Sequence, residues 1–394
     1  MSIKGKAYIM GAYEHPLRDA PDKSTPQLHA ECAEGALEDA GLTKDDIDGY
    51  FCAGDAPGFG AMSMIDYMGL RNVRHMDSTE TGGSSYLLHV GHAAQAIAEG
   101  KCSVALVTLA GRPRQNKFFP GGGGKPGQLT DGPPEAGYEN IYGGSTHNTY
   151  GMCAMRHMYE YGTTSEQLAW IKVAASHHAQ YNPNAFLKDV VTVEQVVNSR
   201  MISDPLHLLD CCVVTDGGGA LIVVSPEVAK TLNRPKVKIM GAGESPKGPM
   251  GGRGLDLTHS GAVWSGPIAF GEAGVTPADI KYASIYDSFT ITVLMQLEDL
   301  GFCEKGQGGK FVADGNLISG VGKLPFNTDG GGLCNNHPTN RGGITKVIEA
   351  VRQLRGEAHP KVQVPNCDIA LAHGTGGSLG TRHGAATLIM EREA

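Results

Sequence analysis

The feature that most constrains the fold of this chain is an internal duplication. The segment KAYIMGA at 6–12 recurs as VKIMGAG at 237–243, and ALEDAGLTKDDIDGYF at 36–51 recurs as AFGEAGVTPADIKYAS at 269–284. Both repeats have nearly the same separation, so coincidence is a poor explanation. A third, shorter match pairs CSVALVT with CDIALAH. The sequence therefore predicts two similar halves within one chain.

Each half is predicted to alternate strands with helices. VALVTLAG at 104–111 is a short β-rich run, whereas QLHAECAEGALEDAG at 27–41 and LLHVGHAAQAIAEG at 87–100 have apolar residues at helical spacing and end at Gly. This alternation predicts parallel sheets with helices on their faces. We place the halves at 1–228 and 235–394, and two such halves can bury a pair of helices between two sheets.

Composition narrows the class of protein. The chain has 394 residues, with 33 Lys and Arg against 41 Asp and Glu, a formal net charge of −8. This balance argues against a dedicated nucleic-acid or anionic-membrane binder. The nine cysteines include no C-x-x-C pair, so we expect reduced thiols, a cytoplasmic location and no metal. No apolar run approaches the roughly 18 residues of a membrane span, and we expect a soluble protein.

One long segment does not fit the alternation. Residues 112–150, part of a loop region that we extend over 112–205 within the first half, are dense in Gly and Pro. The segment is too long for an ordinary connection, which predicts a lid or binding loop. Its GGGGKPG run at 121–127 lacks the Ser or Thr that follows Lys in a phosphate-binding loop.

Several motifs resemble the thiolase superfamily, especially the branch related to the thiolase domain of sterol carrier protein x. The matching stretches are EYGTTSEQLA (160–169), SDPLHLLDCCVVTDGGGALIV (203–223), IYDSFTITVLMQLEDLGFCEKGQGGKFV (285–312), NTDGGGLCNNHP (327–338) and HGTGGSLGT (373–381). The resemblance implies a thiolase fold of two similar α/β halves in layered αβαβα order. It also implies a homodimer and a site for coenzyme A thioesters built from loops of both halves.

The chain departs from this family at the position of the nucleophile. Thiolases carry their nucleophilic Cys at the start of the first half's buried helix, at a fixed spacing before the Gly that ends this helix. In this chain Gly100 ends the helix, and the same spacing places the nucleophile position at Gly83. No Cys lies between Cys52 and Cys102, and Gly cannot form an acyl-enzyme. Ser84 or Ser85 would be a much weaker replacement for a thiol. The sequence therefore predicts that the usual two-step acyl transfer through a thioester is lost.

Other family motifs retain groups that can do chemistry. Tyr286 replaces the family's Asn or His in an NEAF-type motif, and its phenol offers an O–H donor or, if its pKa is lowered, a base. Asp287 would orient the same loop. His337 matches the family's Gly-His-Pro histidine, which points a ring N–H at the thioester oxygen. In the family these positions are functional, although an arbitrary Tyr or His is more often structural.

The C-terminal motif adds a second histidine. His373 stands where many thiolases have their acid/base Cys, and an imidazole exchanges protons near neutral pH. The following glycines, including Gly376, allow backbone N–H groups to converge on an oxygen together with the Gly83 amide, as an oxyanion hole. The alternative is a glycine turn between strands with an incidental histidine.

These residues suggest a reaction that needs no cysteine. We expect retro-aldol cleavage of a β-hydroxyacyl-CoA, as in thiolase-like steroid side-chain aldolases, which act with a small partner bearing an OB-fold domain. Tyr286 would take the hydroxyl proton, His337 would bind the thioester oxygen, and His373 or water would protonate the enolate. Coenzyme A enters as part of the substrate, with no permanently bound cofactor. The alternatives are an acyltransferase that uses another residue such as Cys334, and a non-catalytic acyl-CoA-binding or lipid-binding subunit.

Overall fold

The computed structural model describes residues 2–115, 145–247, 256–338, 341–380 and 382–393. The two parts of the chain follow a similar order of elements, except that the first part has one further strand, β3. The first series comprises β1 (Tyr8–Glu14), α1 (Thr25–Ala40), β2 (Gly49–Phe51), α2 (Ala61–Met68), β3 (His75–Asp77), α3 (Ser85–Ala98), β4 (Val104–Gly111) and β7 (Gly217–Val224). The second comprises β8 (Val237–Lys247), α8 (Ala262–Ala273), β9 (Tyr282–Ile285), α9 (Thr290–Asp299), α12 (Gly343–Arg355), β10 (Ile369–Gly377) and β11 (His383–Arg392).

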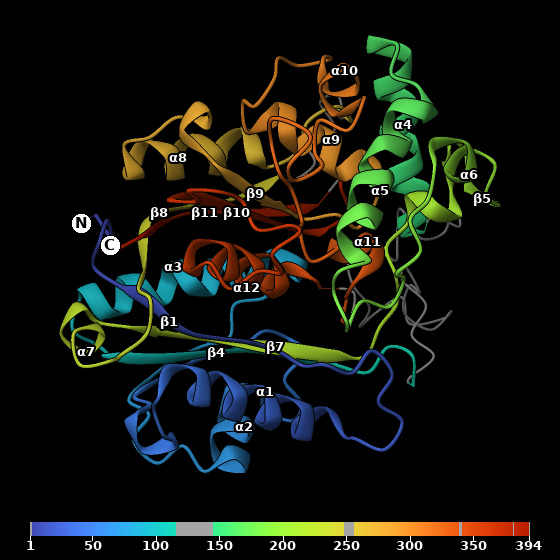
Figure 1. Ribbon diagram of the computed structural model, residues 1–394. Coiled ribbons are helices and arrows are strands. Elements are labelled where there is room, and N and C mark those ends of the chain that lie inside the picture. The colour runs from blue at the N-terminus through green and yellow to red at the C-terminus, as the bar shows by residue number, and fades with distance from the viewer. Residues whose placement is uncertain (1, 116–144, 248–255, 339–340, 381, 394) are drawn as a thin grey trace.

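Nine of the described strands are hydrogen-bonded in one continuous sheet, which folds into two layers, and β5 (Met201–Ser203) and β6 (Leu206–His207) pair separately. The order in the nine-stranded sheet is β3-β2-β4-β7-β1-β8-β11-β10-β9. Strands β1 and β8 pair only at their starts, where Tyr8 lies opposite Lys238 and Ile9 opposite Val237. Beyond that point they diverge, and the two sheets lie one above the other (Figure 1). The division at 1–228 and 235–394 stays a prediction, because the β1–β8 pairing joins the two series of elements in one sheet.

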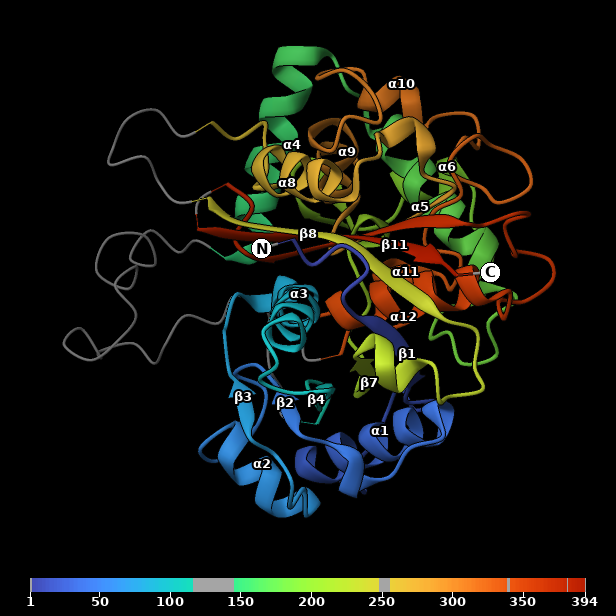
Figure 2. The same ribbon diagram turned by 90° about the vertical axis from the view of Figure 1, so that its left-hand side faces the viewer.

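The layers confirm the predicted thiolase-type α/β architecture, but the prediction of parallel sheets is wrong. Strand β2 pairs in parallel with β3 and β4, and β9 pairs in parallel with β10, whereas the other pairs in this order are antiparallel. Helices α3 and α12 lie between the two sheets, α1 and α2 cover the outer face of one sheet, and α8 and α9 cover the outer face of the other (Figures 1 and 2). The central core cluster contains side chains from both buried helices and both sheets, including Leu87, Val347, Val107 and Ala370. This burial places the start of α3 deep inside the molecule.

The repeated glycines explain why the duplication is visible in the sequence. A Cβ at Gly11 would lie 2.2 Å from the carbonyl oxygen of Ala36, and a Cβ at Gly241 would lie 2.3 Å from that of Ala269. Both glycines therefore let a helix approach a strand of its own half at a distance that no side chain allows. The same close packing, repeated in each half, requires Gly at the same place.

A separate group of elements lies beside α9. It contains α4 (Thr146–Tyr161), α5 (Ser165–Ala179), α6 (Val193–Val197), β5 (Met201–Ser203) and β6 (Leu206–His207), and the short helices α7 (Pro226–Ala229), α10 (Gly308–Val312) and α11 (Gly331–Cys334) complete the fold. Residues 116–144 of the expected lid, including the GGGGKPG run, lie outside the described residues. Within the described part, no helix is long and apolar enough to cross a bilayer.

Candidate active site

The turn that precedes α3 is held by its own polar groups. A short 3₁₀ helix covers Gly82–Ser84 and leads directly into α3. The Gly82 N–H donates to Glu80 Oε1 at 2.6 Å, and the Ser84 hydroxyl donates to the Thr81 carbonyl oxygen at 2.9 Å. Ser84 is fully buried. Its hydroxyl therefore stabilises the turn, which places Gly83 at the positive end of the buried helix.

Tyr286 occupies the space that a side chain at position 83 would need. A Cβ at Gly83 would lie 2.4 Å from Tyr286 Oη, 2.4 Å from Tyr286 Cε2 and 2.4 Å from the Thr375 carbonyl oxygen. Separations this short do not occur between real Cβ atoms and their neighbours. A cysteine at position 83 and the tyrosine at position 286 therefore exclude one another in this packing.

Tyr286 and His337 form a hydrogen-bonded pair. The Tyr286 Oη and His337 Nε2 atoms lie 2.9 Å apart, and the two rings meet edge to face at 70°. Both residues are only 3% exposed. Tyr286 follows β9, and its backbone N–H donates to the His373 carbonyl oxygen at 3.0 Å. The structure thus brings together Tyr286, His337 and Gly83 from three separate motifs.

Burial decides the protonation state of this phenol. Desolvation, followed by the proximity of Tyr150, Cys212 and Asp287, raises the pKa of Tyr286 well above its usual value of 10.0. A free phenolate is therefore disfavoured near neutral pH. The contact with His337 offers another route, because the imidazole can take the phenol's proton when Tyr286 accepts one from a substrate.

Asp287 links the tyrosine loop to the histidine loop. Its carboxylate accepts the N–H groups of Gly332 at 2.8 Å and Leu333 at 3.1 Å, and pairs with Lys346 Nζ at 2.6 Å. The Asp287 side chain is buried, so these partners replace the water that the charge has lost. This arrangement supports the orienting role expected for Asp287.

The residues before His337 also have structural partners. The Asn335 and Asn336 amides both donate to Glu14 Oε1, at 3.1 Å and 3.0 Å, and the Arg18 guanidinium donates to Asn335 Oδ1 at 2.8 Å. The His337 N–H donates to Thr215 Oγ1 at 2.9 Å. These contacts therefore anchor the loop in the first half of the chain.

Gly376 lies against the turn that carries Gly83. A Cβ at Gly82 would lie 2.9 Å from Gly376 Cα and 3.0 Å from the Gly377 nitrogen. A cavity of about 690 Å³ opens beside this contact, and its lining includes Gly82, Gly376 and Arg341. The Arg341 guanidinium pairs with Glu80 across the cavity wall. The two glycine segments assigned to an oxyanion hole are therefore adjacent.

His373 does not join this cluster. The neighbouring Gly374 faces the start of α3, where a Cβ would lie 3.3 Å from Ser84 Cα, and successive residues of a strand point to opposite faces. The His373 imidazole accordingly lies on the other face of the sheet, with Nδ1 at 2.8 Å from Thr387 Oγ1. Burial, followed by the nearby His383, lowers its pKa to about 3. The structure thus places its imidazole away from Tyr286 and His337.

One thiol does lie beside the cluster, and the sequence did not single it out. Cys212 Sγ is 3.5 Å from His337 Nδ1, whereas the adjacent Cys211 thiol donates to the His207 carbonyl oxygen at 3.3 Å. Cys334 is buried, and the nearby Lys172 amine donates to the Leu333 carbonyl oxygen at 2.7 Å. In the described ranges, no group of three His, Cys, Asp or Glu residues could hold a metal ion.

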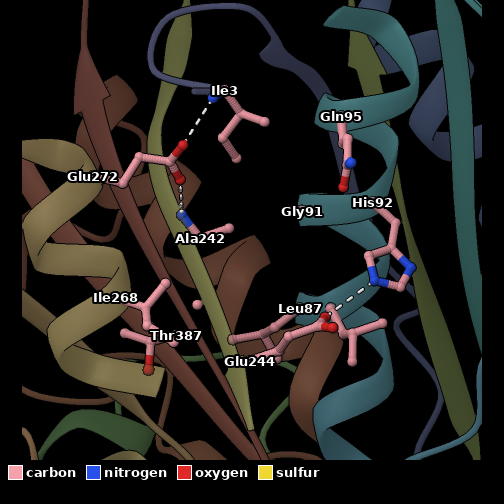
Figure 3. A pocket seen from close by; sticks show the side chains of 12 residues that line it. Ile3, Leu87, Gly91, His92, Gln95, Ala242, Glu244, Ile268, Glu272 and Thr387 are labelled. Atoms are coloured by element: carbon pink, nitrogen blue, oxygen red, sulfur yellow. Dashed lines mark hydrogen bonds and ion pairs between the residues drawn. The ribbon is translucent and has the colours of Figure 1, made fainter. Parts of the chain in front are cut away.

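A second cavity, of about 430 Å³, lies between α3, β8 and α8 (Figure 3). His92 Nε2 is 3.0 Å from Glu244 there, and Glu272 accepts the backbone N–H groups of Ile3 and Ala242. The polar groups of this cavity therefore have partners within the chain. Neither this lining nor that of the 690 Å³ cavity contains Tyr286, His337 or Gly83, although Gly82 and Gly376 line the larger cavity.

Comparisons with known proteins agree with this geometry. The family described as Thiolase C-terminal domain-like matches residues 244–392. The chain is 35% identical to a steroid side-chain-cleaving aldolase of Thermomonospora curvata, over 90% of this chain and 91% of that protein. It is 33% identical to an acetyl-CoA acetyltransferase of Methanothermobacter thermautotrophicus, over 98% and 99% of the two chains.

A solved structure of an Ltp2-ChsH2(DUF35) aldolase has a TM-score of 0.87 at 32% identity, and the match covers 99% of this chain and 98% of that one. Both the sequence relatives and this structure match almost from end to end. The expectation drawn from the motifs is therefore confirmed: the chain belongs to the thiolase superfamily, in the branch that contains steroid side-chain-cleaving aldolases.

Proposed function

We propose that this protein cleaves the Cα–Cβ bond of a β-hydroxyacyl-CoA in a retro-aldol reaction. The proposal is supported mainly by the replacement of the family's nucleophilic Cys by Gly83, because Tyr286 fills the space that a side chain at position 83 would need. The site lacks an atom at position 83 that could hold an acyl group, yet it keeps polar groups next to the helix start. Such a site suits a reaction whose intermediate is a thioester enolate.

The Tyr286–His337 pair supplies the proton transfers. As the substrate's β-hydroxyl proton moves to Tyr286 Oη, the phenol's own proton moves to His337 Nε2, 2.9 Å away. The hydroxyl oxygen becomes a ketone or aldehyde oxygen, and the Cα–Cβ electron pair becomes the enolate of the shortened thioester. The pair then returns the proton to Cα. This relay needs no free phenolate, which the raised pKa of Tyr286 disfavours.

The enolate oxygen needs donors that are fixed before the reaction. We assign this role to the backbone N–H groups of Gly83 and Gly376, whose segments lie in contact. The sequence suggested that His337 would bind the thioester oxygen, but its Nε2 faces Tyr286. His373 has no part in this scheme, because its imidazole lies on the opposite face of the sheet.

An acyltransferase is the second candidate function. One relative carries the name acetyl-CoA acetyltransferase, and a Cys next to a His is the usual sign of an activated thiol. Burial, followed by the proximity of Cys211 and Asp287, raises the pKa of the Cys212 thiol. This shift opposes formation of a nucleophilic thiolate. A non-catalytic acyl-CoA-binding subunit is the third candidate.

The relatives suggest a substrate and a partner to test first. The name steroid side-chain-cleaving aldolase suggests a coenzyme A thioester of a steroid side chain. The matched aldolase structure includes ChsH2(DUF35), which favours a small OB-fold partner for this chain. A homodimer is supported by the edge strand β3, near which Phe59, Met62 and Met76 are exposed. The nine unpaired thiols agree with a cytoplasmic location.

The test is turnover of β-hydroxyacyl-CoA thioesters by the purified protein, alone and with the co-purified partner. Chromatography should detect a shortened acyl-CoA and an equal amount of ketone or aldehyde. Replacing Tyr286 by Phe keeps the ring and removes the relay hydroxyl, so kcat should fall about 10²–10⁴-fold. Unchanged turnover by Tyr286→Phe would reject the relay. Thioester exchange with acetyl-CoA in place of cleavage would favour the acyltransferase.

A further inference from the structure

A short extended segment, residues 211–215, joins the two loops that carry Tyr286 and His337. The Cys212 N–H donates to the Ser288 carbonyl oxygen at 2.9 Å, and the Val213 N–H donates to the Gly332 carbonyl oxygen at 2.9 Å. Thr215 forms a parallel bridge with Pro338 and accepts the His337 N–H. The backbone of this segment is therefore fixed against both loops at once.

This segment aims one side chain at the histidine of the pair. Cys212 Sγ lies 3.5 Å from His337 Nδ1, while His337 Nε2 lies 2.9 Å from Tyr286 Oη. The two ring nitrogens are thus engaged by different residues. In a neutral imidazole one nitrogen carries the proton and the other accepts, so a partner at Nδ1 determines what Nε2 can do.

We infer that Cys212 is a positioning residue, whose sulfur accepts the Nδ1–H of His337 and keeps Nε2 unprotonated, so that Nε2 can take the proton of Tyr286. This inference rests on the proposed function. It holds at both stages of the relay, because the neutral ring and the imidazolium both carry a proton on Nδ1. No bond to sulfur forms or breaks. The role parallels that of the carboxylate that orients the histidine of a catalytic triad.

The state of the thiol agrees with this role. Although Cys212 is partly exposed as a residue, protein atoms surround its sulfur, and burial raises the pKa of the thiol. A neutral thiol still accepts weakly through sulfur, and its proximity places no buried negative charge beside the ring. The nearby carboxylate of Asp287 is engaged with Lys346 and two backbone N–H groups.

The test measures the tautomer of His337 directly. In protein labelled with ¹⁵N-histidine, the two ring nitrogens give distinct shifts, and a His337→Gln variant identifies the signals among the 15 histidines. We expect a protonated Nδ1 and an unprotonated Nε2 in the wild type. Cys212→Ala should move the ring towards the Nε2–H tautomer, and Cys212→Ser should keep the wild-type form. Cys211→Ala is the matched control, because its thiol faces His207, and should change nothing.

The kinetic counterpart separates positioning from structure. With a β-hydroxyacyl-CoA, Cys212→Ala should lower kcat about tenfold, a modest loss expected of an indirect partner, with KM changed less than about threefold. Cys212→Ser should recover most of the rate. An Nε2–H tautomer in the wild type, or the same tautomer and kcat in Cys212→Ala, would overturn the inference. So would an acyl group found on Cys212 by peptide mass spectrometry.

The tautomer measurement does not depend on turnover. If no β-hydroxyacyl thioester reacts, the proposed function fails while the shifts still decide whether Cys212 orients His337. If Cys212→Ala does not fold, the wild-type and Cys212→Ser spectra suffice, because a wild-type ring protonated at Nε2 contradicts the inference by itself.

Discussion

Replacing Gly83 by Ala perturbs the contact on which the proposed chemistry depends. The added Cβ would lie 2.4 Å from Tyr286 Oη and 2.4 Å from the Thr375 carbonyl oxygen, so either the ring or strand β10 has to move. Gly83 is not in the left-handed region, and Ala is intrinsically better than Gly in a helical turn by about 1 kcal/mol. Any destabilisation therefore reports the clash.

The expected size follows from overpacking of a close-packed interior. Inserting a methyl group where no space exists costs about 1–3 kcal/mol of unfolding free energy. A shift of the tyrosine by about 1 Å should lower kcat about 10²-fold, because proton transfer requires hydrogen-bonding distance. Gly271→Ala is the matched control, since a Cβ there meets nothing within 4 Å, and it should leave stability unchanged or raise it.

A double-mutant cycle with Tyr286→Ala measures how much of the destabilisation by Gly83→Ala comes from contact with the Tyr286 ring. Removing the ring should relieve part of the cost of Gly83→Ala, with a coupling energy of about 0.5–3 kcal/mol measured by urea unfolding. Relief should be incomplete, because the Thr375 carbonyl oxygen remains in place. Additive effects of the two substitutions, or a Gly83→Ala variant as stable and active as the wild type, would show that Tyr286 does not exclude a side chain at position 83.

Three further substitutions test the rest of the site and its surroundings. His373→Asn should change kcat less than about threefold. In the wild type, stability should fall between pH 6.5 and about 3, because His373 takes up a proton there in the unfolded state but not in the folded state, and the variant should lose less stability over this range. A large loss of kcat would show that His373 takes part in the reaction. Arg341→Met removes the ion pair with Glu80 that joins the histidine loop to the turn before α3, and kcat/KM should fall about tenfold; an unchanged kcat/KM would show that this link does not position the site. Hydrogen bonds to two carboxylates raise the pKa of His92 to about 9. The contribution of His92 to the free energy of unfolding is therefore complete below pH 6.5 and is lost as the pH rises through 9. His92→Gln should therefore cost about 1–2 kcal/mol at pH 6 and nothing near pH 10, measured by urea unfolding; a cost that persists at pH 10 would contradict this assignment.

Much of the fold was predictable because the same strand and helix pattern occurs twice in the sequence. Close helix–strand packing requires Gly11 and Gly241 at equivalent places, and this requirement keeps the repeats recognisable. The position of Gly83 was also predictable, because the helix that follows it ends at a fixed spacing, near Gly100. Tyr286 and His337 lie in local motifs, so each could be named before their contact was seen.

Two features of the site depend on facts that local sequence does not determine. The glycines after His373 suggested a loop, but the segment continues β10 and pairs with β11. Strand alternation then directs the imidazole to the opposite face, which depends on register. The contact between Cys212 and His337 could not be predicted from local sequence, because it joins residues far apart in the chain. Only the tertiary structure brings them together.

Intact-protein mass spectrometry during turnover of a β-hydroxyacyl-CoA in deuterium oxide distinguishes retro-aldol cleavage from covalent acyl transfer. Retro-aldol cleavage should give a shortened acyl-CoA that carries one deuterium at Cα, released together with a ketone or aldehyde, while the mass of the quenched protein stays unchanged. A stoichiometric acyl adduct on any residue during turnover would contradict it.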